Sequence, residues 1–302
     1  MGRIVSTLAL VCALSGCDRL FGIAVIRTGV ADAPRVDASS PDDRDGDGVV
    51  NELDNCPDVS NPDQRDFDHD NIGDACDRCP LDPDPAQADM DQDGIGDACD
   101  PHALAPGDCL VLLDTFADPM MFALHWQVVG TGTPAVTASA NAVTIVPPAG
   151  AATAILALDT GVVMSGVYDV ELRGAVIPTS TGDAAFAVTA SSGPMQGLAC
   201  GAQRTAIELD TRLADLANNE AKSVQMATPS ASNLRIEMVA DGLPTASCDT
   251  AIAGARQAIN NTFISQLPST GGSGAMAVNV QLVVNGIAFY TRAGTCAAPI
   301  IR

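Results

Sequence analysis

The segment Asp43-Arg44-Asp45-Gly46-Asp47-Gly48 opens a pattern that occurs three times at a period of 23 residues. It returns as Asp66-Phe67-Asp68-His69-Asp70-Asn71 and as Asp89-Met90-Asp91-Gln92-Asp93-Gly94. Another aspartate closes each frame eleven residues after the first, at Asp54, Asp77 and Asp100. Positions 1, 3, 5 and 12 of a twelve-residue loop are the carboxylate positions of a calcium-binding loop. The sixth position (Gly48, Asn71 or Gly94) tolerates the left-handed turn of such a loop.

Negative charge is concentrated in this repeat segment. Residues 41–100 hold 20 acidic side chains and 3 arginines, a net charge of −17 out of −22 for the whole chain. Such a density keeps a chain expanded unless cations neutralise it, and Ca²⁺ is the divalent ion that suits an all-oxygen ligand set. The same charge excludes nucleic acid as a partner, because binding phosphate requires a basic surface.

The N-terminus has the features of an export signal, with Arg3 before the short apolar run 4–14. The run ends in Leu14-Ser15-Gly16-Cys17, which resembles a bacterial lipobox. This resemblance implies a signal peptide over residues 1–16 and a lipid on Cys17, so that the membrane is a partner. Ordinary secretion with cleavage elsewhere is the alternative. Residues 17–42 are expected to form a flexible tether. The expected location is the cell envelope, at the outer membrane or surface of a Gram-negative bacterium.

The number of cysteines agrees with export. Apart from Cys12 in the signal and Cys17, eight cysteines remain, as expected for disulfides in an oxidising compartment. A shared spacing of 20 pairs Cys56 with Cys76 and Cys79 with Cys99. For the other four we expect Cys200–Cys248 and Cys109–Cys296, although four cysteines allow three connectivities. Zinc or redox chemistry at Cys76-x-x-Cys79 is disfavoured, because the repeat already accounts for both residues.

Residues 43–100 resemble the thrombospondin type 3 repeat. The resemblance rests on Asn55-Cys56-Pro57, Asn61-Pro62-Asp63-Gln64 and Gly73-Asp74-Ala75-Cys76-Asp77, and on the later Cys79-Pro80 and Gly96-Asp97-Ala98-Cys99-Asp100. It implies an irregular chain wrapped around calcium and pinned by disulfides. Five prolines and the scarcity of large apolar residues also predict no long helix and no hydrophobic core. The candidate calcium ligands are Asp43, Asp45, Asp47, Asp54, Asp66, Asp68, Asp70, Asp74, Asp77, Asp89, Asp91, Asp93, Asp97 and Asp100.

The first loop also looks like an EF-hand or dockerin loop. An EF-hand or dockerin loop requires a following amphipathic helix, and Asn55-Cys56-Pro57 follows instead. Calcium could regulate the protein or only stiffen it. Extracellular modules bind calcium weakly, at roughly 10⁻⁴–10⁻³ M, so a stiffened spacer is the simpler expectation.

Residues 103–302 are expected to form an all-β sandwich. Short apolar runs are separated by turn residues, and they predict strands at 142–146, 155–158, 167–172, 184–190, 205–209, 234–239, 276–284 and 287–291. A helix could instead fit at 212–221 or at 251–259. The stretches Asp183-Ala184-Ala185-Phe186 and Glu208-Leu209-Asp210-Thr211 resemble L-type lectins, which implies a concanavalin-like jelly roll. In that family Asp183 would bind sugar, and Glu208 and Asp210 would hold a metal.

The departures from the lectin pattern are specific. Ala184 replaces an expected glycine, and the histidine of the transition-metal site is missing. A turn role for Asp183 and a solvated strand face for Glu208 and Asp210 therefore stay open.

No paired carboxylates with glycosidase spacing and no Gly-x-Ser-x-Gly motif occur, so we expect no enzyme. The expectation is a calcium-binding surface lipoprotein whose C-terminal region binds carbohydrate or a surface protein in adhesion. A purely structural envelope protein is the alternative, and a polysaccharide hydrolase is less favoured.

Overall fold

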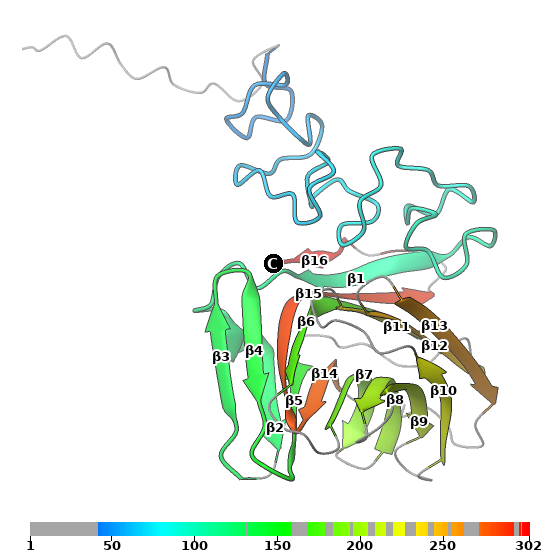
Figure 1. The fold of residues 1–302 in the computed structure, drawn as a ribbon. Coiled ribbons are helices and arrows are strands. Elements are labelled where there is room, and N and C mark those ends of the chain that lie inside the picture. The colour runs from blue at the N-terminus through cyan, green and yellow to red at the C-terminus, as the bar shows by residue number, and fades with distance from the viewer. Residues whose placement is uncertain are drawn as a thin grey trace, which may run out of the picture.

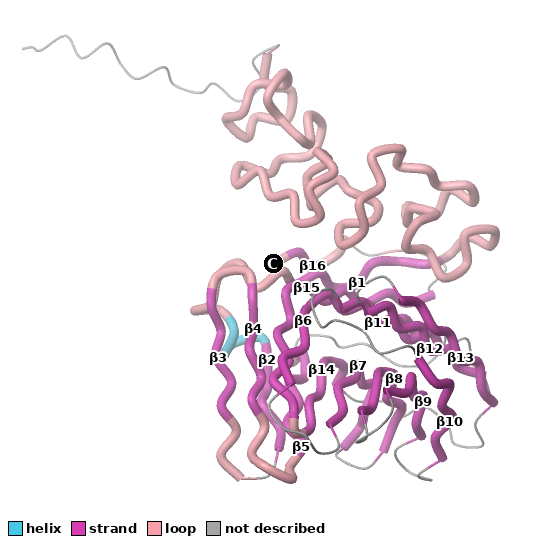
Figure 2. The backbone as a smooth tube through the Cα atoms, viewed as in Figure 1, coloured by secondary structure: helices cyan, strands magenta, loops and turns pink. Residues whose placement is uncertain are grey.

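In the computed structural model of this chain, the described residues are 42–130, 132–158, 168–178, 184–193, 196–204, 209–215, 220–226, 234–240, 245–252, 255–262, 272–292, 296 and 298–302. They form an irregular repeat segment beside a two-layered β-sandwich (Figure 1). Figure 2 shows loops and turns throughout the repeat segment, and strands through most of the sandwich. Within the described residues, no helix has the length and apolar character needed to cross a membrane.

The first sheet has nine described strands in the order β13-β12-β11-β6-β15-β1-β16, with β4 also pairing β15 and β3 pairing β4. Neighbours are antiparallel except β1 and β16, which run parallel. The bounds are β1 Asp108–Asp114, β3 Ala135–Ser139, β4 Ala142–Val146, β6 Tyr168–Pro178, β11 Leu234–Ala240, β12 Thr245–Ile252, β13 Ala255–Thr262, β15 Val280–Arg292 and β16 Ile300–Ile301. We call the surface that faces away from the second sheet the outer face.

The second sheet has seven described strands in the order β10-β9-β8-β7-β14-β5-β2, all antiparallel. The bounds are β2 Trp126–Gly130, β5 Ala152–Ala157, β7 Ala184–Gly193, β8 Gln196–Arg204, β9 Leu209–Asp215, β10 Glu220–Met226 and β14 Gly272–Val278. One short helix, α1 Phe122–His125, precedes β2. The all-β sandwich expected from the sequence is confirmed.

The main hydrophobic core lies between the two sheets. It includes Leu112 of β1, Ile155 of β5, Leu213 of β9 and Phe289 of β15, all without measurable exposure. The disulfide Cys200–Cys248 joins β8 to β12 and so links the two sheets through this core. Alternate residues of a strand face opposite sides, and the core therefore takes only half of each central strand.

A β-bulge in β15 changes which residues face the core. Leu282 and Val284 face it before the bulge, whereas Ile287 and Phe289 face it afterwards. The change from even to odd numbers occurs because Asn285 is the extra residue between the pairs Val284–Gly174 and Gly286–Arg173. Gly286, Ala288 and Tyr290 consequently belong to the outer face, where Ala288 and Tyr290 are buried in a second apolar cluster.

Several expected elements differ from the structure. Of the two expected helices, residues 212–215, 220–221, 251–252 and 255–259 lie in strands, because antiparallel pairing and burial of Leu213 and Ile259 outweigh the helix propensity of alanine-rich sequence. The expected strand 276–284 is two strands, β14 and β15, in different sheets. They are separated by Asn279, whose φ of 51° makes the corner. Residues 205–208 of another expected strand lie outside the described residues.

Candidate calcium loops and their contact with the sandwich

The three aspartate loops share one hydrogen-bond pattern. The first aspartate of each loop accepts from the backbone N–H groups three and five residues later, at 2.7–3.2 Å. The third and fifth positions each accept from the N–H group two residues later. Because many backbone donors converge on the carboxylates, the loop backbone fixes where each side chain lies.

Left-handed backbone occurs at two positions of every loop. The sixth position has φ of 99° at Gly48, 77° at Asn71 and 103° at Gly94, in the places where the sequence predicts this conformation. The fourth position is also left-handed, with φ of 79° at Gly46 but 65° at both His69 and Gln92. The left-handed backbone conformation costs a residue other than glycine roughly 1–2 kcal/mol. His69 and Gln92 therefore hold the second and third loops in a conformation that their local sequence does not favour.

The carboxylates of each loop converge, and their chemistry fits a calcium ion. In each triad, Asp43/Asp45/Asp47, Asp66/Asp68/Asp70 and Asp89/Asp91/Asp93, carboxylate oxygens lie within 4.8 Å of one another. The second aspartate of each triad also has a buried Oδ2 without a hydrogen-bond partner, at Asp45, Asp68 and Asp91. A buried unpartnered carboxylate oxygen is costly. Calcium would satisfy these oxygens, and the loop aspartates are the residues that would hold it.

The other expected calcium ligands fall into two groups, the closing aspartates of the loops and two aspartates outside the triads. Asp54, Asp77 and Asp100 each accept an N–H bond from two residues later, and Oδ2 of Asp54 and of Asp100 is buried without a partner. Asp74 and Asp97 lie outside the triads. Each accepts from the residue after its loop's first aspartate, Phe67 or Met90. These last two therefore brace the loops whether or not they also bind metal.

A fourth group, which the sequence analysis missed, adjoins the third loop. Asp100, His102 and Asp108 offer ligand atoms within 4.8 Å of one another, and His102 Nδ1 lies 3.0 Å from Asp108 Oδ2. Asp108 begins β1, and Asp93 Oδ2 accepts from its N–H. His102 stands where the repeat period has Cys56 and Cys79, which is the signal that could have identified it. This group joins the last loop directly to the sandwich.

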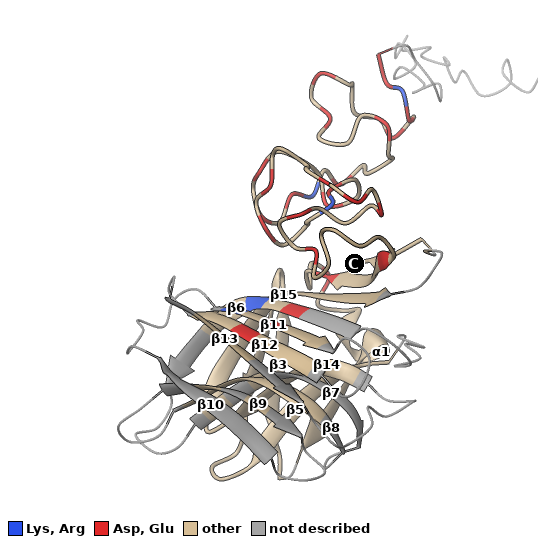
Figure 3. Cartoon of the chain, turned by 90° about the vertical axis from the view of Figure 1, so that its right-hand side faces the viewer, with Lys and Arg blue, Asp and Glu red and all other residues tan. Residues whose placement is uncertain are grey.

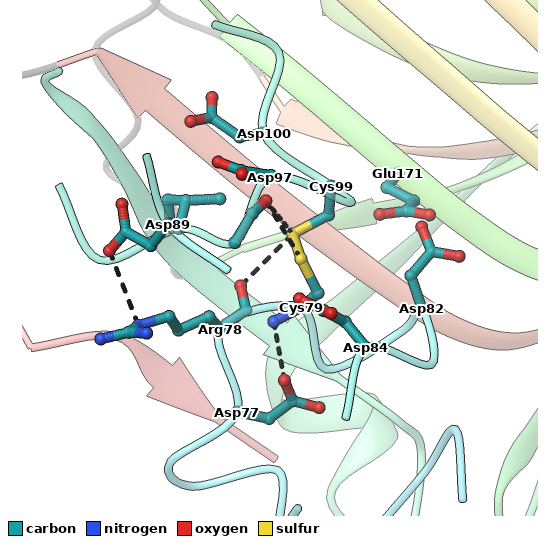
Figure 4. The surroundings of a disulfide bond; sticks show 12 residues. Asp77, Arg78, Cys79, Asp82, Asp84, Asp89, Asp97, Cys99, Asp100 and Glu171 are labelled. Carbon is teal, nitrogen blue, oxygen red and sulfur yellow. Dashed lines mark hydrogen bonds and ion pairs between the residues drawn. A yellow bond between two sulfur atoms is a disulfide. The ribbon is translucent and has the colours of Figure 1, made fainter. Parts of the chain in front are cut away.

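The repeat segment carries the two disulfides expected from spacing, Cys56–Cys76 and Cys79–Cys99. In the sandwich the structure contains Cys200–Cys248 and Cys109–Cys296. Cys79–Cys99 lies against the sandwich, as Figure 4 shows. In each unit one disulfide sulfur lies against a backbone carbonyl oxygen: Cys56 Sγ is 3.2 Å from Gly73 O, and Cys79 Sγ is 3.2 Å from Gly96 O. The two units are therefore built alike around their disulfides.

The repeat segment packs on the outer face of the nine-stranded sheet. Its scarcity of apolar residues predicts no hydrophobic core. Its Cys79, Leu81, Ile95 and Cys99 are 0–5% exposed. They form one apolar cluster with Leu113, Ala288 and Tyr290 of the sandwich, and Phe67 packs against it. The expectation of a spacer without apolar packing is therefore wrong. The few apolar residues of the segment complete a hydrophobic cluster to which β1 and β15 also contribute.

Charged groups surround this apolar contact on β6 and β11. Arg173 lies opposite Arg235 in the strand register, and Glu171 lies opposite Glu237. Like charges directly opposite one another are destabilising. Here they are offset by diagonal pairs, with Arg235 Nε 2.9 Å and Arg173 Nη2 3.0 Å from Glu171 Oε1.

Asp82 of the repeat segment completes this charged group. Its carboxylate pairs with Arg173 and lies 3.2 Å from Arg235 Nη2. Figure 4 shows Asp82 next to Glu171. Figure 3 shows acidic residues along the repeat segment and few charged residues in the part of the sandwich that is described. The two arginines therefore meet carboxylates from both parts of the chain.

The protonation of this cluster is shifted by burial. Burial raises the pKa of Glu171 to about 7, although the Arg235 charge acts in the opposite direction. Burial lowers the pKa of Arg173 to about 10. Burial also acts to lower the pKa of Arg235, but Glu171 and Glu237 outweigh it and the net shift is upward.

In the calcium loops, burial raises the pKa of Asp68 to about 7 and that of Asp77 to about 6. A bound cation would favour the charged form of these carboxylates.

The lectin-like residues lie at the margin of what the structure describes. Asp183 and Glu208 are outside the described residues, as is Cys17, where a lipid is expected. Asp210 is in β9, where it pairs with Gln203 of β8 and Gln225 of β10. The roles assigned to these residues by resemblance remain predictions.

Comparison with known proteins identifies the repeat segment. Residues 37–64 and 88–102 match the family model of the thrombospondin type 3 repeat, a calcium-binding repeat. No curated protein matches the chain.

Among solved structures, the chain resembles a carbohydrate esterase from the Shiga toxin-encoding bacteriophage phi24B (15% identity, TM-score 0.39, 62% of this chain and 100% of that one). It also resembles a legume lectin-like domain from Entamoeba histolytica (9%, 0.39, 58% and 94%). A third is the VIP36 exoplasmic/lumenal domain in a Ca²⁺/Man3GlcNAc-bound form (11%, 0.40, 58% and 89%). These TM-scores are too low to carry an argument about function.

Proposed function

We propose that this protein is a calcium-stabilised lipoprotein of the cell envelope whose sandwich binds carbohydrate, or another surface ligand, in adhesion. The observation that carries the proposal is the set of three aspartate triads, each with a buried carboxylate oxygen that lacks a partner, in a segment that packs directly on the sandwich. Calcium bound there would stabilise both the repeat segment and its seat on the outer face. The lipobox ending in Cys17 supports attachment to a membrane.

Binding, rather than catalysis, is the proposed role of the sandwich. Two of its four glutamates, Glu171 and Glu237, lie within 3.2 Å of arginine nitrogens in the charged group described above. We infer that these carboxylates serve docking, because the arginines that they hold also pair with Asp82 of the repeat segment. A structural envelope protein without a ligand is the second candidate, favoured by the apolar contact between repeat segment and sandwich.

A glycan array screen tests the binding proposal. The mature chain from residue 17, with Cys17→Ser to remove the lipid, is screened in calcium and again in EGTA. Calcium-dependent binding to one class of glycan is the expected result. Binding to no glycan in either condition would contradict the carbohydrate proposal and leave the structural candidate.

A further inference from the structure

A cavity of about 780 Å³ lies between the second repeat and the outer face of the nine-stranded sheet. Its repeat wall includes Arg65, Asp66 and Asp68, and its sandwich wall includes Arg173 and Asn285. Ligand cavities in proteins usually measure about 300–1,000 Å³, so this one has the size of a small-molecule site. Both parts of the chain are needed to form it.

The walls combine hydrogen-bond donors and acceptors, with three arginines and four aspartates. Arginines, which only donate, stand on both walls at Arg65, Arg173 and Arg235. Aspartates, which only accept when ionised, stand beside them at 66, 68, 74 and 82. A free anion would meet the aspartates and a free cation would meet the arginines. A polyhydroxylated ligand suits both, because each hydroxyl can donate and accept.

On the sandwich wall the two arginines are held by ion pairs, and one polar atom has no partner. Arg173 and Arg235 are 22% and 15% exposed, and their carboxylate partners hold them in place. Nε of Arg173 is buried without a hydrogen-bond partner, and unlike the loop aspartates it is not a candidate calcium ligand. Phe67 and Leu81 add apolar surface, against which the C–H groups of a sugar ring can pack. A wall whose arginines are held by ion pairs and that still offers an unsatisfied donor is already organised for binding.

We propose that this cavity is the ligand site of the protein and that the ligand is a saccharide held between repeat segment and sandwich. The inference rests on the proposed function and locates its site away from the lectin-like position Asp183. Calcium in the second loop would neutralise Asp66 and Asp68 on the repeat wall. Binding therefore requires the calcium-loaded, docked repeat segment as well as the sandwich.

Filling the cavity tests the sandwich wall. Ala251 of β12 lines the cavity, so Ala251→Trp fills it and removes no charge. Ala258 of β13 lies on the same face of the sheet, since it is two residues from Arg256, the partner of Ala251. Ala258 is exposed and is not among the cavity residues, so Ala258→Trp is the matched control. The probe is a glycan array of neutral and uronic-acid-containing oligosaccharides, followed by calorimetry with its strongest binder.

A second pair of variants tests the repeat wall. Arg65 lines the cavity and pairs with Asp63 at 3.0 Å, whereas Arg44 pairs with Asp58 away from the cavity. Arg65→Ala and Arg44→Ala therefore remove the same kind of side chain from the two places. Calcium titration and the thermal unfolding midpoint check that every variant is folded and loaded.

We expect Ala251→Trp and Arg65→Ala each to weaken binding at least about tenfold, while both controls stay within about twofold of wild type. If wild type binds but each cavity variant binds like its control, the site assignment is overturned and the proposed function stands. Loss of binding in Asp183→Ala alone would place the site at the lectin-like position. If wild type binds no glycan, the proposed carbohydrate function itself fails.

Discussion

Leu81 of the repeat segment packs over Gly286 of β15. A Cβ placed on Gly286 would lie 2.7 Å from Leu81 Cδ2 and 3.0 Å from Phe67 Cζ, closer than packed atoms approach. Gly286 reaches the outer face only because the bulge at Asn285 changes the side to which the following residues point. The repeat segment can therefore pack here because Gly286 has no side chain and because Asn285 is an extra residue in the strand.

This contact predicts a coupled pair of substitutions. Leu81 is 3% exposed, so Leu81→Ala should lower the free energy of unfolding by about 2–5 kcal/mol in calcium. Gly286→Ala should lower it by about 1–3 kcal/mol through overpacking. In the Leu81→Ala background Gly286→Ala should cost less, because the closest clashing atom is gone. Denaturant unfolding of the four proteins measures the coupling, and simple additivity would argue against the contact.

The two repeat disulfides should differ in what they support. Each closes a loop of similar length and in the chain-entropy model contributes roughly 3 kcal/mol. Only Cys79 and Cys99 also belong to the cluster shared with the sandwich. Replacing both by alanine should therefore release the repeat segment and increase the radius of gyration in small-angle scattering. Replacing Cys56 and Cys76 is the matched control and should loosen only the first unit. Equal expansion in both variants would contradict the docking.

Glu171 predicts a pH dependence of stability. Its pKa is raised from 4.5 to about 7, so between these values the folded protein binds more protons than the unfolded chain. The free energy of unfolding should then fall as pH rises from about 4.5 to 7, by about 3 kcal/mol at most. The groups that face it are Arg173, Arg235, Glu237 and Asp82.

Glu171→Gln should flatten this slope, measured by denaturant unfolding in saturating calcium. Glu52→Gln, at an exposed glutamate of the repeat segment, is the matched control. A slope that is equal in wild type and in Glu171→Gln would show that Glu171 titrates normally.

Much of the calcium site could be predicted from sequence, because its ligands are close together along the chain. The spacing of Asp43, Asp45 and Asp47 is a local property, and backbone N–H groups of the same loop fix the geometry. The left-handed sixth position could be read from Gly48 for the same reason. Disulfides with a spacing of 20 are likewise local to one repeat.

The contact between the two parts could not be predicted, because it depends on residues far apart in sequence. Nothing near Gly286 indicates that Leu81 covers it, and the bulge at Asn285 has no clear sequence signal. Arg173 and Arg235 look like solvated strand residues until pairing places them side by side with Asp82 between them. The helix expected at 251–259 failed similarly, because strand pairing overrode local propensity.

Calorimetric titration with calcium is the measurement that tests the central claim most directly. The mature chain with Cys17→Ser is compared with the same chain carrying Asp45→Asn, Asp68→Asn and Asp91→Asn, which alters the buried unpartnered oxygens of all three loops. Asp58→Asn with Asp63→Asn, outside the triads, is the control. We predict binding at roughly 10⁻⁴–10⁻³ M for wild type and control, and loss of most of the heat in the triple variant. A triple variant that titrates like wild type would contradict the account.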